Sequence, residues 1–98
     1  MSLVDIKRAD RRLIMLRALA EEPDYSLSDI VLRGLLVEFG HDVALDAVRG
    51  DLDWLAGRGL LTLGEAGSAV VATITARGVD VAAGRVLIEG VRRPRPGE

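Results

Sequence analysis

The stretch from Asp42 to Gly78 reads DVALDAVRGDLDWLAGRGLLTLGEAGSAVVATITARG, and its hydrophobic period changes part-way along. In the first half, apolar residues recur at three- and four-residue steps, which is the spacing of one face of an α-helix. In the second half, two short runs rich in β-branched residues flank a segment of turn-forming residues. The stretch therefore predicts a helix followed by a β-hairpin.

The boundaries of these elements follow from residues that cap or break helices. The predicted helix covers residues 43–58, with Asp42 as its N-cap and Gly59 directly after it. The predicted strands cover residues 60–63 and 69–74, and the five residues between them form the turn. The side of the helix predicted to face the core carries Ala44, Val48, Leu52 and Leu55.

Two more helices are predicted before this stretch. The first covers residues 4–21, and an extended link follows it over residues 25–27. The apolar stripe of the first helix consists of Ile6, Ala9, Leu13, Leu16 and Ala20. The second helix starts after Ser28, a favourable N-cap, and ends at Gly40, a favourable left-handed C-cap. Its apolar stripe consists of Leu32, Leu35, Leu36 and Phe39.

A last helix is predicted over about residues 76–86, with Thr75 as its N-cap. The chain of 98 residues suits one domain, which we place at residues 1–90. Residues 91–98 contain prolines and a glycine and are predicted to form a flexible tail. The predicted class is α+β, mostly helical, with a two-stranded hairpin and a C-terminal helix.

The predicted order of helix, helix, turn, helix, hairpin and helix resembles the winged helix-turn-helix domain. The Gly59-Leu60-Leu61 and Thr73–Gly78 segments resemble the two strands of the wing and their flanks in bacterial repressors of the antibiotic-resistance and arsenical-resistance types. A wider resemblance links the chain to small proteins of Mu-like phages and prophages, a family described as winged-helix and often labelled regulatory. The stretches that carry it are Arg8–Leu13, Phe39–His41, Val48–Leu52 and Gly78–Ala82. The resemblance implies a phage or bacterial source.

The composition limits the classes of function. There are no cysteines, so disulfides and thiolate metal sites are excluded. No apolar run approaches the roughly 18 residues of a membrane span, and the first residues do not form a secretory signal. We expect a cytoplasmic protein. The formal net charge of −2 does not favour nucleic acid, but basic residues are concentrated at both ends of the chain.

If the chain binds duplex DNA, the winged-helix resemblance implies that the helix over residues 43–58 enters the major groove. Its solvent face is predicted from helical periodicity to carry Leu45, Asp46, Arg49, Gly50 and Asp53. Arg49 suits guanine or phosphate, whereas the aspartates would face a polyanion. The same side chains can be a solvated face, with Asp46 paired to Arg49, or an acidic docking face for a basic protein partner.

The basic residues of the first helix have two interpretations. The spacing of Lys7, Arg8 and Arg11 turns them away from the apolar stripe, so they can form a solvated face or contact phosphates, and Arg12 can join the phosphate contacts. The candidate phosphate contacts are Lys7, Arg8, Arg11 and Arg12. The two function hypotheses are therefore a phage regulator that binds DNA and a non-enzymatic protein interaction module.

No catalytic constellation is recognisable in the sequence. His41 is the only histidine and is predicted to be a cap or surface residue, so no metal site of ordinary composition is expected. No serine stands in a nucleophile motif, and no glycine-rich phosphate loop is present. We expect neither an enzyme nor a cofactor. Apolar residues outside the main stripes favour a homodimer; they include Leu3, Val4, Ile14, Met15, Leu19, Val86, Leu87, Ile88 and Val91.

Overall fold

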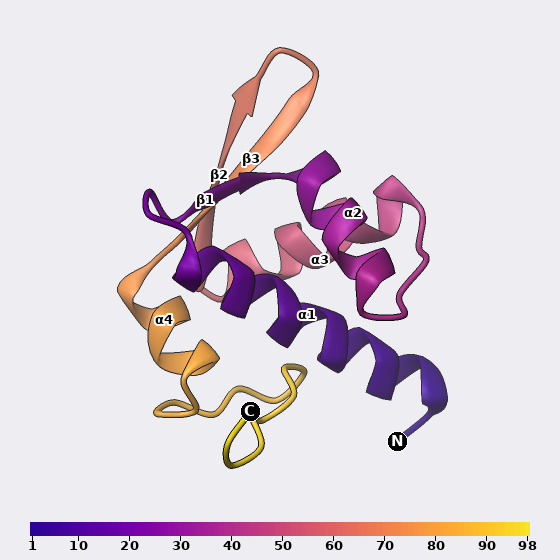
Figure 1. Ribbon diagram of the computed structural model, residues 1–98, viewed down its shortest axis with the longest axis vertical. Helices are drawn as coiled ribbons and strands as arrows, with labels where there is room; N and C mark the ends of the chain where they lie inside the picture. The colour runs from indigo at the N-terminus through magenta and orange to yellow at the C-terminus, as the bar shows by residue number, and fades with distance from the viewer.

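The computed structural model describes every residue from Met1 to Glu98 and shows an α+β fold (Figure 1). Half of the chain is helical, and three strands form one antiparallel sheet. The elements are, in chain order, α1 (Leu3–Glu21), β1 (Ser26–Ser28), α2 (Asp29–Glu38), α3 (Leu45–Gly57), β2 (Leu61–Ala66), β3 (Ala69–Ile74) and α4 (Ala76–Ala82). None of the helices is long and apolar enough to cross a membrane.

The hairpin of β2 and β3 is longer than the sequence predicts. Its strands pair from Leu61 opposite Ile74 to Ala66 opposite Ala69, so the turn consists of Gly67 and Ser68 alone. Gly67 has a φ of 63°, a value that suits glycine in a two-residue hairpin turn. The predicted five-residue turn was wrong because backbone pairing with β3 continues through Gly64. In Figure 1 the hairpin projects beyond the helices.

The segment predicted as an extended link is partly a strand. β1 pairs with β3 in antiparallel register, which places β3 in the centre of the sheet order β1-β3-β2. The hydroxyls of Ser26 and Thr73 lie 2.6 Å apart across this pair. This pairing joins the start of α2 to the hairpin, although the two are far apart in sequence.

Side-chain caps fix three of the four helix starts. The hydroxyls of Ser2, Ser28 and Thr75 each accept a backbone N–H from the first turn of α1, α2 and α4, respectively. Two of these caps, Ser28 and Thr75, confirm the sequence prediction. The cap by Asp42 was wrong, because α3 begins only at Leu45 and its N-cap residue Ala44 makes no side-chain bond. Arg33 donates to the carbonyl of Val43 at 3.1 Å and contacts the non-helical connection before α3.

The core lies between α1, α2, α3 and the sheet. Val48, Leu52 and Leu55 of α3 are fully buried, as predicted, whereas Ala44 is exposed. The predicted stripe of α1 is only partly buried: Leu13 and Leu16 are fully buried, whereas Ile6 is 50% exposed. Neighbouring elements cover more than one side of α1. As a result, Met15 and Leu19 are also fully buried. The prediction that these two residues add apolar surface for a homodimer was therefore wrong.

Other apolar residues are more exposed than predicted. Phe39 is 59% exposed, because it follows α2 as its C-cap residue and does not extend the buried stripe. Leu3, Val4 and Leu87 are also more than half exposed, whereas Ile14, Val86, Ile88 and Val91 pack partly against the core. The homodimer stays a prediction. The exposed apolar surface available to form it is smaller than the sequence indicates.

The last residues return to α1 after α4 ends at Ala82, earlier than the sequence predicts. The backbone N–H of Arg92 donates to the carbonyl of Ala9 in α1 at 3.1 Å. Figure 1 shows this C-terminal segment, in yellow, running below α1. Residues 91–98, predicted to be a flexible tail, thus have defined contacts with the domain.

The contact between α4 and the residue before β2 requires glycine at position 78. A Cβ atom at Gly78 would lie 2.0 Å from the carbonyl oxygen of Leu60 and 2.6 Å from Ile74. We expect Gly78→Ala to lower the free energy of unfolding by about 3 kcal/mol, because backbone atoms must move to make room. Gly50→Ala is the matched control: its Cβ would meet nothing within 4 Å, and we expect a gain of up to about 1 kcal/mol from helix propensity. Urea unfolding of both variants tests this, and equal stability of Gly78→Ala and the natural chain would contradict it.

Candidate nucleic-acid interface

The outward face of α3 is acidic. Asp46, Gly50 and Asp53 are exposed on it, as the sequence predicts, and Leu45 is half-buried at its edge. Neither Asp46 nor Asp53 forms an ion pair within the chain, so both carboxylates face solvent. A polyanion approaching this face directly would meet uncompensated negative charge.

Arg49 does not point to solvent from this face. Its Nε donates to the carboxylate of Asp29 at 2.7 Å, and its Nη2 donates to the carbonyl of Ser68 at 3.1 Å. The predicted pair with Asp46 was therefore wrong. Arg49 joins α3 to the first residue of α2 and to the hairpin turn, and its side chain is 40% exposed.

The Asp29 carboxylate, which sequence reasoning missed, is completely buried. It accepts hydrogen bonds from Arg49 and from the backbone N–H groups of Val70 and Ile30. Burial alone would raise the pKa of Asp29, but these hydrogen bonds outweigh it and hold the pKa below its usual value. The one local signal is an acidic residue in the first turn after a serine N-cap, which does not reveal that the side chain is buried.

A second buried carboxylate, that of Asp51, joins α3 to α1. Arg11 donates to one oxygen of Asp51 at 2.8 Å, and Arg12 donates to the other at 3.1 Å. The side chains of Arg11, Arg12 and Asp51 are 11%, 10% and 3% exposed. The expectation that Arg11 faces water was wrong, because its partner on α3 lies 40 residues away in the sequence.

The indole ring of Trp54 lies against two arginines, one of which is Arg12. The guanidinium carbons of Arg12 and Arg58 each lie 3.8 Å from the centre of the indole ring. Burial and the nearby charges of Arg8 and Arg11 lower the pKa of Arg12, against the opposing effect of Asp51. We call the guanidinium groups of Arg8, Arg11, Arg12 and Arg58 the arginine cluster. Arg11 and Arg12 share the single carboxylate of Asp51, and Arg8 and Arg58 have no anionic partner, so the cluster carries a net positive charge.

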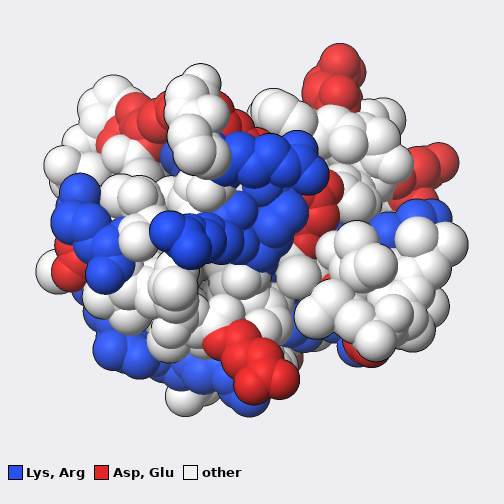
Figure 2. Space-filling model, turned by 90° about the horizontal axis from the view of Figure 1, so that it is seen from below, with Lys and Arg blue, Asp and Glu red and all other residues white.

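The members of the arginine cluster differ in what they can still bind. Arg8 and Arg58 are exposed and make no hydrogen bond or ion pair within the chain, and the same holds for Lys7. Arg11 and Arg12 instead each donate a hydrogen bond to Asp51, so fewer of their N–H groups are free. Figure 2 shows basic side chains gathered across the middle of the lower face, where α1 and the C-terminal segment lie. Two of the four predicted phosphate contacts, Lys7 and Arg8, are thus fully available to a ligand.

His41 is not the surface residue that the sequence predicts. Its ring is 10% exposed, and its Nε2 lies 2.7 Å from Asp10 of α1. Asp10 also accepts a hydrogen bond from Arg92 at 2.6 Å. Burial raises the pKa of Asp10, but the hydrogen bonds with His41 and Arg92 prevail and lower it. No group of three or more His, Cys, Asp or Glu side chains is arranged to hold a metal ion.

Comparison with known proteins gives the family. The chain is 44% identical over 92 residues to the uncharacterized protein gp26 of Escherichia phage Mu, and the match covers 94% of this chain and 95% of gp26. The chain belongs to the family of phage Mu gp26. An uncharacterized protein of Haemophilus influenzae is 38% identical over 63 residues, which cover 64% of the chain and 61% of that protein. No family model and no solved structure matches the chain. The phage relationship predicted from the sequence is confirmed, and it indicates no activity by itself.

The Asp29–Arg49 pair gives a prediction for stability. Because the folded-state pKa of Asp29 is depressed, its ionisation stabilises the fold above the unfolded-state pKa near 4, and this contribution is lost as pH falls through the folded-state pKa. We expect Asp29→Asn to cost about 3 kcal/mol at pH 7, the low end for breaking a buried pair, since Arg49 is partly exposed. Urea unfolding from pH 7 to pH 3 should show the difference from the natural chain shrinking in acid. A constant difference across that range would show that the charge of Asp29 is not the cause.

Proposed function

We propose that this chain is a winged-helix protein that binds duplex DNA, as a regulator or accessory factor of a Mu-like phage. The element order α1-β1-α2-α3-β2-β3-α4, with a three-stranded antiparallel sheet, is the order expected of a winged helix, and supports this assignment. In that scheme α3 is the recognition helix and the β2–β3 hairpin is the wing. Kinship with phage Mu gp26 supports the phage setting.

The observation that carries the proposal is the arginine cluster. A guanidinium stacked on an aromatic ring keeps its planar N–H edge free for phosphate oxygens, which it can bind through two parallel hydrogen bonds. Arg58 on Trp54 has this arrangement, and Arg8 and Lys7 of α1 are exposed and form no ion pair within the chain. Arg11 and Arg12, which are largely buried against Asp51, add positive charge to the same cluster. Contacts of this kind position a protein on the duplex without reading its sequence.

The charge of α3 decides how the duplex would lie. Arg49 is held by Asp29 and Ser68, and Asp46 and Asp53 oppose insertion of the outward face into the major groove. The β2–β3 turn, with Gly67 and Ser68 at its tip, supplies no cation either. We therefore place the phosphate backbone along the α1–α3 junction, over the arginine cluster. This mode favours affinity that depends on salt over strong sequence preference.

The proposal predicts a defined loss of DNA affinity. We expect Arg8→Gln combined with Arg58→Gln to weaken binding to mixed-sequence duplex DNA at low salt by roughly tenfold or more and to reduce the slope of log K against log salt by about 2, since two phosphate contacts are removed. Fluorescence anisotropy at several salt concentrations measures both quantities.

The matched control for this experiment changes the same net charge elsewhere. Arg33 donates to a backbone carbonyl in the connection before α3, and Arg85 forms an exposed pair with Asp80 of α4. We expect Arg33→Gln combined with Arg85→Gln to leave the salt slope close to that of the natural chain. Equal loss in both double variants would mean that only net charge matters, and no binding by the natural chain at low salt would refute the proposal.

A second candidate function, a module that binds a basic protein partner, is favoured by the acidic face of α3. Asp42, Asp46 and Asp53 are exposed, and the only arginine between them is turned to Asp29. Carboxylates arranged in this way are complementary to a cationic surface and opposed to DNA. This function needs neither catalysis nor a cofactor.

Charge reversal separates the two functions. If the acidic face binds a basic protein, Asp46→Lys combined with Asp53→Lys should abolish capture of that protein from a bacterial lysate while leaving the fold intact, because both side chains are exposed. Affinity pull-down with mass spectrometry identifies proteins that are lost with the variant, and circular dichroism checks the fold. Capture that is unchanged by the double reversal would refute the second function.

A further inference from the structure

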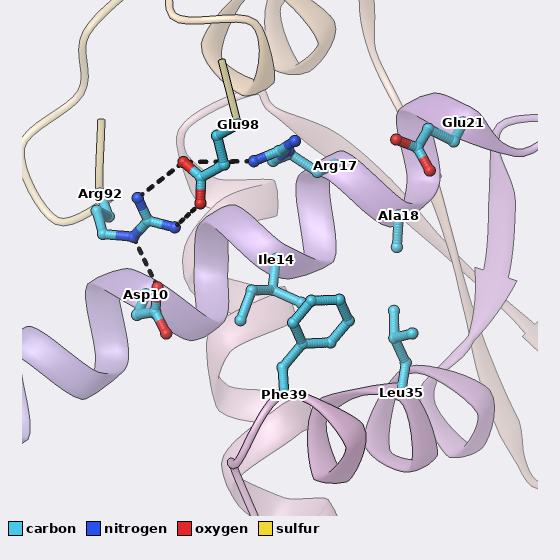
Figure 3. A pocket seen from close by; sticks show the side chains of 9 residues that line it. All are labelled: Asp10, Ile14, Arg17, Ala18, Glu21, Leu35, Phe39, Arg92 and Glu98. Carbon is cyan, nitrogen blue, oxygen red and sulfur yellow. Dashed lines mark hydrogen bonds and ion pairs between the residues drawn. The ribbon is translucent and has the colours of Figure 1, made fainter. Parts of the chain in front are cut away.

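A groove lies between α1 and α2, and no member of the arginine cluster lines it. Its volume is about 320 Å³, within the range of small-molecule sites. Its apolar lining consists of Ile14 and Ala18 from α1 and Leu35 and Phe39 from the α2 side. Figure 3 shows these four side chains together, with charged residues around them. The 59% exposure of Phe39 leaves part of this apolar surface in contact with water.

One end of the groove already holds a carboxylate from the chain itself. The Glu98 side chain accepts hydrogen bonds from Arg92 at 3.1 and 2.7 Å, and Arg17 lies 3.4 Å from it (Figure 3). The backbone N–H of Arg95 donates to the same carboxylate at 2.8 Å. The hydrogen bond with Arg92 is the main cause of a Glu98 pKa of about 2. Two guanidinium groups thus form a carboxylate-binding site beside an apolar surface.

We propose that this groove binds a small monocarboxylate with an apolar body, whose carboxylate takes the place of the Glu98 side chain between Arg17 and Arg92. A ligand carboxylate can replace Glu98 because the Glu98 side chain is 27% exposed to water and the ligand would make the same ion pairs in exchange. Arg92 is kept in position without Glu98, since its Nε also donates to Asp10. An incoming ligand would keep the ion pairs and would also cover Ile14, Leu35 and Phe39.

The other charges of the groove restrict the ligand to one carboxylate. Asp10 is paired with Arg92 and hydrogen-bonded to His41. Glu21 lies beside Ala18 at the end of the groove far from Arg92 in Figure 3 and has no cationic partner. A second carboxylate on the ligand would approach Glu21 and be repelled. The groove is lined by no member of the arginine cluster, so the proposal of a carboxylate site does not depend on the proposal of DNA binding.

Titration with hexanoate, followed by NMR of the folded chain, tests the proposal. We expect hexanoate to shift the side-chain signals of Ile14, Leu35 and Phe39, and hexanamide and the dicarboxylate adipate to shift them far less at equal concentration. In Glu98→Gln, which removes the internal competitor, hexanoate should bind roughly threefold tighter or more. No shift of these signals in Glu98→Gln at tens of millimolar hexanoate would overturn the proposal.

Two arginine variants show whether the carboxylate is recognised at the assigned place. Arg17→Gln should weaken hexanoate binding to the Glu98→Gln chain severalfold, because Arg17 would contact the ligand carboxylate directly. Arg85→Gln, which removes an exposed ion pair with Asp80 of α4, should leave binding unchanged. Equal binding of hexanoate and hexanamide, or equal binding with and without Arg17, would show an apolar cleft without carboxylate recognition and would contradict the proposal.

Discussion

A carboxylate that is removed from water must be neutralised by charge and hydrogen bonds, and α3 is fixed on both sides by this requirement. On one side, Asp51 of α3 is buried against Arg11 and Arg12 of α1. On the other, Asp29 of α2 is buried against Arg49 of α3. Asp29 without Arg49, or Asp51 without both Arg11 and Arg12, would be an uncompensated buried charge. The orientation of α3 relative to α1, α2 and the hairpin therefore depends on these ion pairs as well as on the apolar core.

The same requirement decides which cations remain for a partner. Arg49 is the one basic residue near the outward face of α3, and its guanidinium is occupied by Asp29 and Ser68. Arg11 and Arg12 are directed to Asp51, which brings Arg12 onto Trp54 and leaves the opposite face of the indole to Arg58. Stabilising α3 thus leaves its outward face acidic and concentrates positive charge at its junction with α1.

The sequence predicts those parts of the fold whose signal is local. Hydrophobic period identified all four helices and the hairpin, and Ser28 and Thr75 were recognised as N-caps because capping involves residues three apart. The partner of a charged residue is not local. Asp51 pairs across 39 and 40 residues, and Asp29 pairs across 20, so periodicity could not show that these charges are buried. Helical spacing favoured a pair between Asp46 and Arg49, but the tertiary partner Asp29 offers a dry site where the interaction is stronger.

The C-terminal segment contacts the domain through residues that composition alone does not single out. Gly90 has a φ of 99°, and a Cβ atom there would lie 2.7 Å from the Trp54 ring. The glycine is therefore required for close packing against the indole, and Arg12 donates to its carbonyl at 3.2 Å. Two residues later, Arg92 contacts both the backbone and Asp10 of α1. The packing of Gly90 against Trp54 and the two hydrogen bonds of Arg92 therefore fix where this segment crosses α1, and neither contact can be read from composition.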